Sequence, residues 1–531
     1  MSTQPASTPQ APITDGVKAA AARQRANPKP ITSNMSPLGP KQFGLEEARH
    51  LLWRAGFGGT PNQIQTLVSW GLEKSVDYLV NYQQVAGSDP DPKAFRNDII
   101  RPPTAEERAM AQQARRARDE ESLARLRVRQ QEAERLDREQ VRAMQKWWLT
   151  RMIETPRPLE EKLTLLWHGH FATSFRTIED SYHMYAQNNL LRKHAAGSFS
   201  DMLYGIIRDP AMIKYLDNDE SRKGRPNENL ARELMELFGL GVGNYTEQDI
   251  KEGARALTGY TFRDDEFVFE RQNHDTGVKQ LLGAKGGFNG EDFVRLILQQ
   301  RACARFVATK LYRYLVHDYP TGRKAVDEAA ASVINQMADG IRRDNYAMGP
   351  TIRRLLSSQH FYDPAIRNEQ IKSPIQLIVG AARSLNTPVR DLDALLDAAK
   401  LMGQDIFFPP SVKGWDGGRS WINTATLFVR QNTLVFMLTG KRPMGRDPLA
   451  DREPFDAAPL LTQLADAYPD SASGDPERVI DAILQFAVGR TDAASRDTLE
   501  QFVRSHGGRL TPKVITDIML LVTAMPEYQL C

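Results

Sequence analysis

The segment from Thr104 to Gln145 runs for more than forty residues without glycine or proline. Because these two residues interrupt helices most readily, the segment is predicted to be mostly helical. Its apolar residues are sparse, and arginine and glutamate are mixed at helical spacing, which is typical of a solvated helix. We therefore expect a charged helical insertion at 104–146, formed by one long protruding helix or by a hairpin of two helices.

The rest of the chain also has mainly helical periodicity. One example begins at Pro226, because proline suits the first turn of a helix. An apolar stripe follows it, made by Leu230, Leu234, Leu237 and Phe238. The strand-like region is short: Phe267 and Phe269 alternate with other residues after the turn-forming pair Asp264-Asp265. The sequence predicts an all-α array of packed helices with at most one short β-hairpin.

Composition divides the 531 residues into three parts. Residues 1–40 are rich in serine, threonine, proline, alanine and glutamine, so we expect a disordered arm that cannot bury enough apolar surface to fold. Residues 41–440 are predicted to be a helical core that contains the charged insertion. We expect a linker, DPLADREPFDAAP, before a C-terminal helical subdomain within 441–531.

Charge and composition limit the partners and the location. The net charge of +3 is too small to indicate nucleic-acid binding, and the chain has no apolar run long enough to span a membrane. Cys303 and Cys531 are far apart, which does not favour a disulfide framework. The first residues show neither an apolar signal core nor twin arginines, so we expect a cytoplasmic protein.

His168 and His170, in the sequence WHGH, are the first candidate metal ligands. Histidine is the commonest metal ligand, and this pair sits among large apolar residues. Positions two apart on a helix point to nearly opposite faces, so both can bind one ion only if the helix ends at Gly169. The alternative is a pair of hydrogen-bonded core histidines.

Glu233 and Glu236 are the candidate carboxylate ligands, because they share a helical face with Arg232 and would complete a histidine and carboxylate site. The alternative is a salt-bridge network through Arg232. The Glu-x-x-His pairs of di-iron helical bundles are absent, and Asp180-x-x-His183 is the nearest approach to one.

His274 and Asp275 follow the strand-like region, where a histidine on a loop is well placed for proton transfer. An ordinary turn closed by aspartate and glycine is the alternative. We predict that these two residues and Arg232 have catalytic roles. We also expect three motifs to converge on one pocket, because buried polar groups need partners. They are WHGH at 167–170, the helix at 226–238 that carries Glu233 and Glu236, which we call the acidic helix, and NHDTG at 273–277.

Several of these stretches together resemble a bacterial family known as domain of unknown function 1800. The central stretch is KGRPNENLARELMELFGLGVGNYTEQDIKEGARALTGY, preceded by YLDN. The other matching pieces are ARHLLWRAGFG, PLEEKLTLLWHGHFATS, NHDTGVKQLLG and FFPPSVKGWDGG. The resemblance covers roughly residues 43–440 and implies no particular activity.

Two hypotheses about function follow. In the first, the protein is an enzyme, with a divalent metal ion as a possible cofactor, whose pocket of histidine, glutamate and aspartate lies between helices. In the second, it is a non-catalytic scaffold or binding protein that recruits a protein partner, or a second copy of itself, through residues 104–146. Polar residues among apolar helices lower stability unless they find partners, and such local losses of stability often mark functional sites. This slightly favours the enzyme hypothesis.

Overall fold

The structure, a computed structural model, describes residues 31–531 apart from positions 88, 102, 389, 442–452, 454 and 490–492. Most of the arm predicted to be disordered and part of the predicted linker therefore lie outside the described residues. Residues 31–40 are described and lie against the body of the protein. There Thr32 N–H donates to Asp363, and Pro37 forms an isolated bridge with Ser358.

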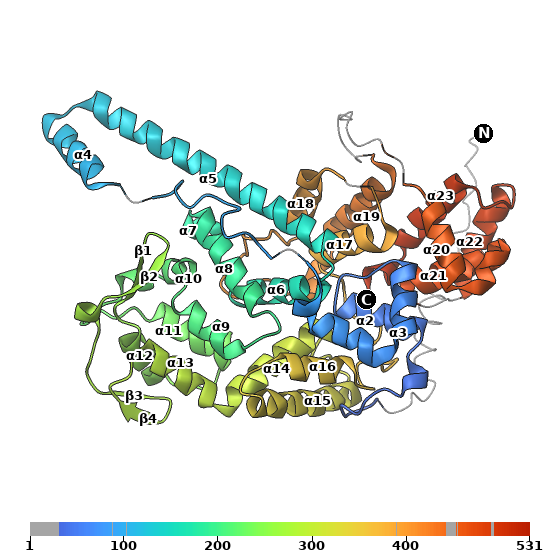
Figure 1. The fold of residues 1–531 in the computed structure, drawn as a ribbon, viewed down its shortest axis with the longest axis horizontal. Coiled ribbons are helices and arrows are strands. Elements are labelled where there is room, and N and C mark those ends of the chain that lie inside the picture. Colours follow the sequence, from blue (N-terminus) through green and yellow to red (C-terminus); the bar gives the residue numbers. More distant parts are fainter. Residues whose placement is uncertain are drawn as a thin grey trace, which may run out of the picture.

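The prediction of an all-α fold is confirmed: helices dominate the described residues, with two small two-stranded sheets among them (Figure 1). The N-terminal helices are α2 (Leu45–Arg54) and α3 (Pro61–Val80). The central helices are α6 (Pro158–His170), α7 (Phe175–Ile178), α8 (Ser181–Lys193), α9 (Phe199–Ile206), α10 (Pro210–Tyr215), α11 (Asn229–Glu233) and α12 (Glu247–Ala256). A π-helical turn, Leu234–Gly239, continues α11.

The helices after the sheets complete the body of the protein. They are α13 (Gly290–Gln299), α14 (Arg301–Leu315), α15 (Lys324–Arg343), α16 (Gly349–Leu356), α17 (Pro374–Leu385), α18 (Leu392–Leu401) and α19 (Thr424–Thr439). The C-terminal helices are α20 (Ala458–Ala467), α21 (Pro476–Val488), α22 (Ala493–Ser505) and α23 (Pro512–Ala524). They pack onto the N-terminal helices, where the Arg49 guanidinium donates to the carbonyl oxygens of Phe486 and Ala487.

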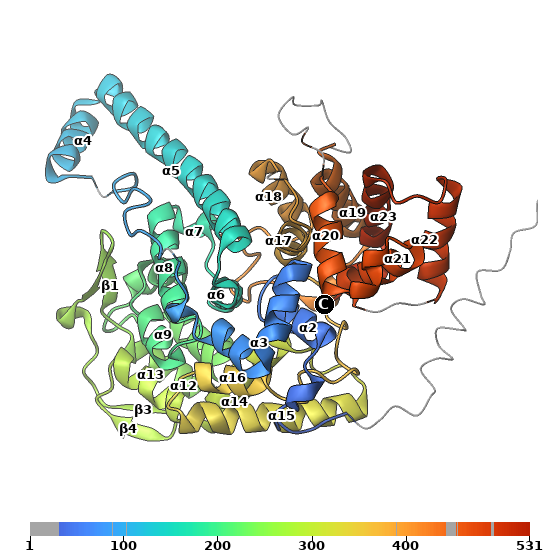
Figure 2. The same cartoon turned by 45° about the vertical axis from the view of Figure 1, so that its right-hand side comes forward.

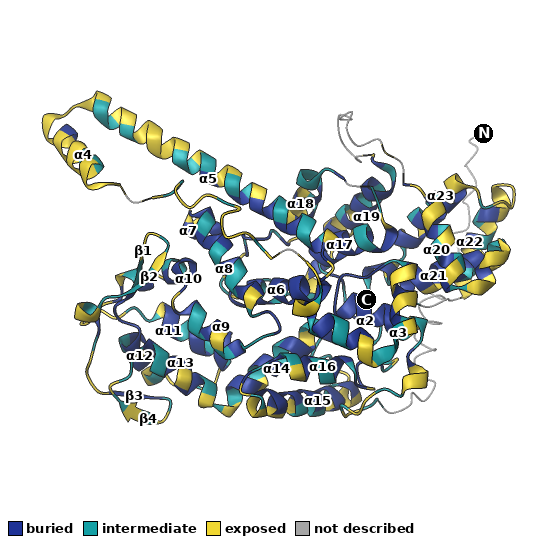
Figure 3. Ribbon diagram, in the orientation of Figure 1, coloured by how far each residue is buried: buried dark blue, intermediate teal, exposed yellow. Residues whose placement is uncertain are grey.

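The charged insertion is a hairpin of two helices, α4 (Ala105–Ala117) and α5 (Glu120–Glu154). Thr104 and Glu107 form a capping box that starts α4, and Asp119 caps α5. Arg118 turns the chain between them in the left-handed conformation, with φ of 52°. The hairpin projects from the body in both views, and its outer part is mostly exposed (Figures 1, 2 and 3).

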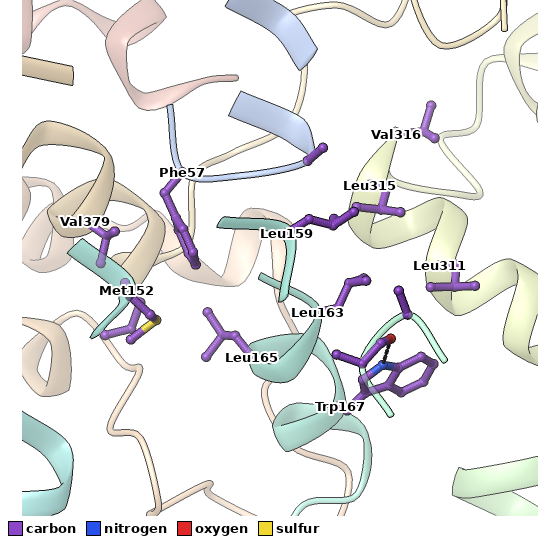
Figure 4. Packing of buried hydrophobic residues seen from close by; sticks show 14 of the residues in the cluster. Phe57, Met152, Leu159, Leu163, Leu165, Trp167, Leu311, Leu315, Val316 and Val379 are labelled. Atoms are coloured by element: carbon purple, nitrogen blue, oxygen red, sulfur yellow. Dashed lines mark hydrogen bonds between the residues drawn. The ribbon is translucent and has the colours of Figure 1, made fainter. Parts of the chain in front are cut away.

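The core is organised around α6, which is buried on nearly all sides. Leu159 and Leu163 face α14 in Figure 4, whereas Leu165 lies nearer Met152 of α5. Trp167 is fully buried, and its ring N–H donates to the carbonyl oxygen of Ala195 at 2.8 Å. Such a helix has no free face, so its polar residues must find partners inside the protein.

Two hairpins occur where at most one was expected. Strands β1 (Tyr260–Arg263) and β2 (Glu266–Phe269) pair in the region that the alternation of phenylalanines predicted. Strands β3 (Lys279–Leu281) and β4 (Ala284–Gly286) form a second antiparallel pair. Strands of three residues are too short to give a periodic pattern, which is why the second hairpin was not predicted. Within the described residues, no helix has the length and apolar character needed to cross a membrane.

Candidate metal centre

Asp180 begins α8 and places one carboxylate oxygen beside a histidine. Its Oδ1 accepts hydrogen bonds from the backbone N–H groups of Tyr182 at 3.0 Å and His183 at 3.1 Å, as an N-cap residue does. Its Oδ2 then lies 3.7 Å from Nδ1 of His183. The cap therefore fixes the carboxylate in an orientation that also faces the imidazole.

The turn between β1 and β2 approaches the other side of the same imidazole. Nε2 of His183 lies 3.1 Å from the carbonyl oxygen of Asp264 and 3.3 Å from Oδ1 of Asp265. Asp264 has a φ of 53°, a conformation that aspartate tolerates better than most residues. The side chain of Asn97 donates to the other oxygen of Asp265 at 2.9 Å, which holds this carboxylate in place.

Asp180, His183 and Asp265 thus form a compact set of candidate metal ligands, which we call the α8 cluster. One ligand atom from each lies within 4.8 Å of the other two, and the described residues contain no second group of three or more His, Cys, Asp or Glu side chains with this property. Asp180 and His183 are buried, and Asp265 is half-buried. Figure 1 shows α8 between the β1–β2 hairpin and α5.

Buried carboxylates surround the α8 cluster. Burial raises the pKa of Asp180, and the charges of Asp137 and Asp265 raise it further. Burial also raises the pKa of Asp137, whose Oδ1 accepts from the N–H of Ser181, and it raises that of Asp209 to about 6. Asp137, Asp180 and Asp209 form no ion pair with lysine or arginine in the described part of the chain. This excess of acid favours a cation.

A cleft of about 740 Å³ lies near the start of α8, although Asp180, His183 and Asp265 are not among the residues that line it. Its walls come from α5, α7 and α18, and they include Asp137 and Glu179. Glu179 directly precedes Asp180. Asp137 accepts from the backbone N–H of Ser181, which directly follows Asp180. Two residues next to the cluster, Asp137 and Glu179, thus line a space that can hold a small molecule.

The two histidines of WHGH lie on a continuous helix, because α6 extends to His170. Nε2 of His168 accepts from the N–H of Phe407 at 3.0 Å, and burial lowers the pKa of His168 to about 3. Nε2 of His170 lies 3.0 Å from the carbonyl oxygen of Phe238, and burial holds its pKa well below the usual value. Each ring therefore has its own backbone partner.

The acidic helix has a half-buried polar face. Glu236 accepts from the hydroxyl of Tyr245 at 2.8 Å, and burial raises the pKa of Glu233, with the charge of Glu236 raising it further. Arg232 pairs with Glu228 at 3.3 Å and with Glu247 at 3.1 Å. The salt-bridge network expected as the alternative is present around Arg232, while Glu233 and Glu236 have no ion pair with a basic residue among the described contacts.

His274 and Asp275 are held by α12 and the loop that follows it. Nδ1 of His274 lies 2.9 Å from the carbonyl oxygen of Thr258. The Arg255 guanidinium binds both oxygens of Asp275, at 2.8 and 3.2 Å, and holds the pKa of that carboxyl at about 2.

The structure joins two of the three predicted motifs directly. The contact between His170 and Phe238 links WHGH to the acidic helix. The third motif, with His274 and Asp275, stands apart: within the described residues, no hydrogen bond or ion pair connects either residue to WHGH or to the acidic helix. None of the predicted ligands His168, His170, Glu233 and Glu236 belongs to the α8 cluster. Their metal-binding and catalytic roles stay predictions.

Sequence reasoning missed the α8 cluster as a site. The spacing Asp180-x-x-His183 was noted as the nearest approach to a metal-binding pair, and Asp264-Asp265 was interpreted only as turn material. The sequence marked Asp180 and His183 by their helical spacing and Asp265 by its place in a turn, but the contact between α8 and this turn is tertiary. An acid and a histidine one helical turn apart would have singled out α8, whereas nothing in the sequence identifies Asp265 as its partner.

Comparison with known proteins gives one family. The sequence profile described as "Protein of unknown function (DUF1800)" matches residues 50–530. The match confirms the resemblance found in the sequence and extends it almost to residue 531. No curated protein and no solved structure matches the chain significantly.

Proposed function

The chain belongs to the DUF1800 family of proteins of unknown function, and because that description names no reaction, we propose from its side chains that it is a divalent metal-dependent enzyme. The observation that carries the proposal is the α8 cluster, in which ligand atoms of Asp180, His183 and Asp265 lie within 4.8 Å of one another. This retains the enzyme hypothesis drawn from the sequence and moves its proposed centre to α8.

The ligand set indicates which ions fit. A site with one imidazole nitrogen and two carboxylates suits Mn²⁺, Fe²⁺ or Zn²⁺. It suits Ca²⁺ and Mg²⁺ less well, because these ions prefer sites made only of oxygen ligands. The carbonyl oxygen of Asp264 accepts from Nε2 of the same imidazole at 3.1 Å, which leaves the lone pair of Nδ1, the nitrogen nearer Asp180, for an ion. Burial of unpaired carboxylates supports the proposal further, because a divalent charge offsets their mutual repulsion.

The cleft near the start of α8 is the proposed substrate site. A divalent cation beside it would supply Lewis-acid chemistry, either by polarising a substrate oxygen or by ionising water. Asp137 lies between the two, since it lines the cleft and binds the N–H of Ser181. Its raised pKa, caused by burial, suits it to move a proton near the cluster.

Metal analysis of the purified protein tests the proposal. We expect equimolar bound Mn²⁺, Fe²⁺ or Zn²⁺ by elemental analysis, and a lower unfolding temperature after chelation. Asp180→Asn, which keeps the helix cap, and His183→Ala should both lower the metal content. His506→Ala is the matched control, because His506 is exposed and, among the described residues, its side chain contacts the neighbouring Ser505 and Phe502. A metal-free protein whose unfolding temperature no added cation raises would refute the proposal.

A second candidate function is partner recruitment through residues 104–146. The observation that favours it is the projection of α4 and α5, whose outer residues are mostly exposed, with Val128 and Met110 among the exposed large apolar side chains. A long solvated hairpin contributes little to its own core. Light scattering of the full chain and of a variant lacking the outer hairpin tests self-association: loss of a dimer in the variant would support this candidate, and two monomers would count against it.

We retain a cytoplasmic location as part of the proposal. The two cysteines, Cys303 and Cys531, are free and buried, and proteins of reducing compartments rarely contain disulfides. Fractionation of cells that express the natural gene tests this location directly.

A further inference from the structure

Three basic side chains are buried at the junction of α2, α6 and the segment before α17. Arg54 and Lys372 are 0% exposed, and Lys162 is 1% exposed. Lys162 donates to the carbonyl oxygen of Trp53 at 3.3 Å, and Lys372 donates to that of Tyr528 at 2.7 Å. Arg54 donates to the carbonyl oxygens of Leu315 and Tyr314, at 3.0 and 2.8 Å. We call these three residues the basic cluster.

The basic cluster has no acidic partner of the ordinary kind. None of its three residues forms an ion pair with Asp or Glu anywhere in the described ranges, and their oxygen partners are backbone carbonyls. Taking a cation out of water costs several kcal/mol unless an anion compensates it. An arginine keeps its charge at neutral pH, so the cluster cannot become neutral by losing protons alone.

The thiol of Cys531 is the ionisable acid that faces this cluster. Its Sγ lies 2.9 Å from Nη1 of Arg54, and the residue is 2% exposed. The backbone holds it there, because Cys531 N–H donates to the carbonyl oxygen of Gln370 and Leu530 forms a bridge with Ile371. The last residues of the chain therefore deliver a sulfur atom into a buried positive field.

We propose that Cys531 is a thiolate in the folded protein and serves as the internal counter-ion of Arg54, Lys162 and Lys372. Ionisation of the thiol releases its proton to solvent and leaves the negative charge on Sγ. The ion pair between Cys531 and these basic side chains then holds residues 526–531 against α2 and α6.

The electrostatics of the surrounding groups agree with this assignment. Burial alone would raise the pKa of Cys531, but Arg54, Lys162 and Lys372 outweigh it and lower the pKa below its usual value. Burial lowers the pKa of Lys162 to about 7 and holds that of Lys372 well below its usual value. The charge of Cys531 raises both pKa values and so opposes the effect of burial. The charge of Arg49, on α2, and the rings of Tyr314 and Tyr528 also face this centre.

Cys303 is a matched control inside the same protein. It is 0% exposed in α14, and burial raises its pKa to about 12, with only the hydrogen bond of Tyr346 opposing this effect among the described residues. A thiolate absorbs ultraviolet light more strongly than a thiol. At neutral pH, the spectrum of the wild type minus that of Cys531→Ser should contain the thiolate band, and the wild type minus Cys303→Ser should not. Absence of the band in the first difference would overturn the proposal.

Substitution with a carboxylate gives a second, independent test. Asp and Asn have nearly the same shape, so Cys531→Asp and Cys531→Asn differ in charge and in the amide N–H group that replaces one accepting oxygen. If the site requires an anion, the Asp variant should unfold at a higher temperature than the Asn variant. If the buried cations need no anion, burying a carboxylate is the costlier change, the order reverses and the proposal fails. Either order is decisive, and the comparison survives if Cys531→Ser fails to fold.

Discussion

Nε2 of His170 lies 3.0 Å from the carbonyl oxygen of Phe238, inside the π-helical turn that continues α11. A carbonyl oxygen only accepts, so Nε2 carries the proton and Nδ1 presents a lone pair. That Nδ1 atom is buried and has no hydrogen-bond partner among the residues that the structure describes. Isolated π-helical turns are frequent at functional sites, and here one joins two motifs that the sequence had singled out.

The first prediction decides which histidine binds metal. Titration of the metal-free protein with Mn²⁺, followed by calorimetry, should give a much weaker signal for His183→Ala than for His170→Ala, because His183 has two carboxylates within reach. Glu236→Gln should behave like His170→Ala. The reverse pattern would assign the ion to WHGH and the acidic helix, as the sequence first indicated.

The fold could be predicted further than the site. Absence of glycine and proline sufficed to predict a helical insertion at 104–146, since this signal is local. It left one long helix and a hairpin of two helices open, and the caps at Thr104 and Asp119 that begin α4 and α5 are seen only in the structure. The α8 cluster depends on a contact between Asp265 and His183, which are more than eighty residues apart. Periodicity reports which face of an element is buried, but it does not report which other element covers that face.

The histidines of WHGH illustrate the same limit in a different way. The sequence placed them correctly among apolar residues, and the structure buries both. Their partners are backbone groups of Phe407 and Phe238, however, and every residue except proline has both backbone groups. A histidine that binds a backbone group leaves no specific signal elsewhere in the sequence, so this arrangement could not be distinguished from ligation.

The second prediction concerns the buried carboxylate of Glu161, which is 0% exposed. It binds Arg192 at 2.8 and 3.1 Å, accepts from the ring N–H of Trp148 at 2.8 Å, and also pairs with Arg151. Glu161→Gln leaves the buried Arg192 without its carboxylate partner and leaves Arg151 with Glu160, so unfolding in urea should show a loss of roughly 3–5 kcal/mol.

Glu132→Gln is the control for that measurement. Glu132 is exposed and pairs with Arg135 one turn along the same helix, where solvent screens the interaction. It should unfold like the wild type. A Glu161→Gln variant that is equally stable would mean that the central network around α6 does not hold the core together.

The third prediction follows from the pKa of His168, which burial lowers from 6.5 to about 3. Between these values the unfolded chain binds a proton that the folded protein does not. Stability therefore falls as the pH is lowered from about 6.5 to about 3, and it is fully present above about 6.5. At ~1.4 kcal/mol per pH unit, the loss over this interval is roughly 5 kcal/mol.

His168→Gln isolates this effect, because the amide oxygen of glutamine can accept from the N–H of Phe407 as Nε2 does and does not titrate in this range. The free energy of unfolding should be measured at several pH values for both proteins. The difference between wild type and variant should shift steadily in favour of the variant as the pH falls. A difference independent of pH would show that His168 titrates alike in both states.

The last prediction concerns the outer part of the α4–α5 hairpin. Residues of α5 become buried only from Asp137 and Val141 onward, so the outer part contributes almost nothing to the core. Replacing 105–131 with a short Gly-Ser linker should leave the free energy of unfolding within roughly 0.5 kcal/mol of the wild type, as for changes away from the core. The metal content should also be unchanged. A second deletion that reaches Trp148, which is 0% exposed, should prevent folding, because it removes a side chain that binds Glu161. If the shorter deletion also unfolds the protein, the hairpin must be covered by further contacts, and a second copy of the chain becomes the first partner to test by light scattering.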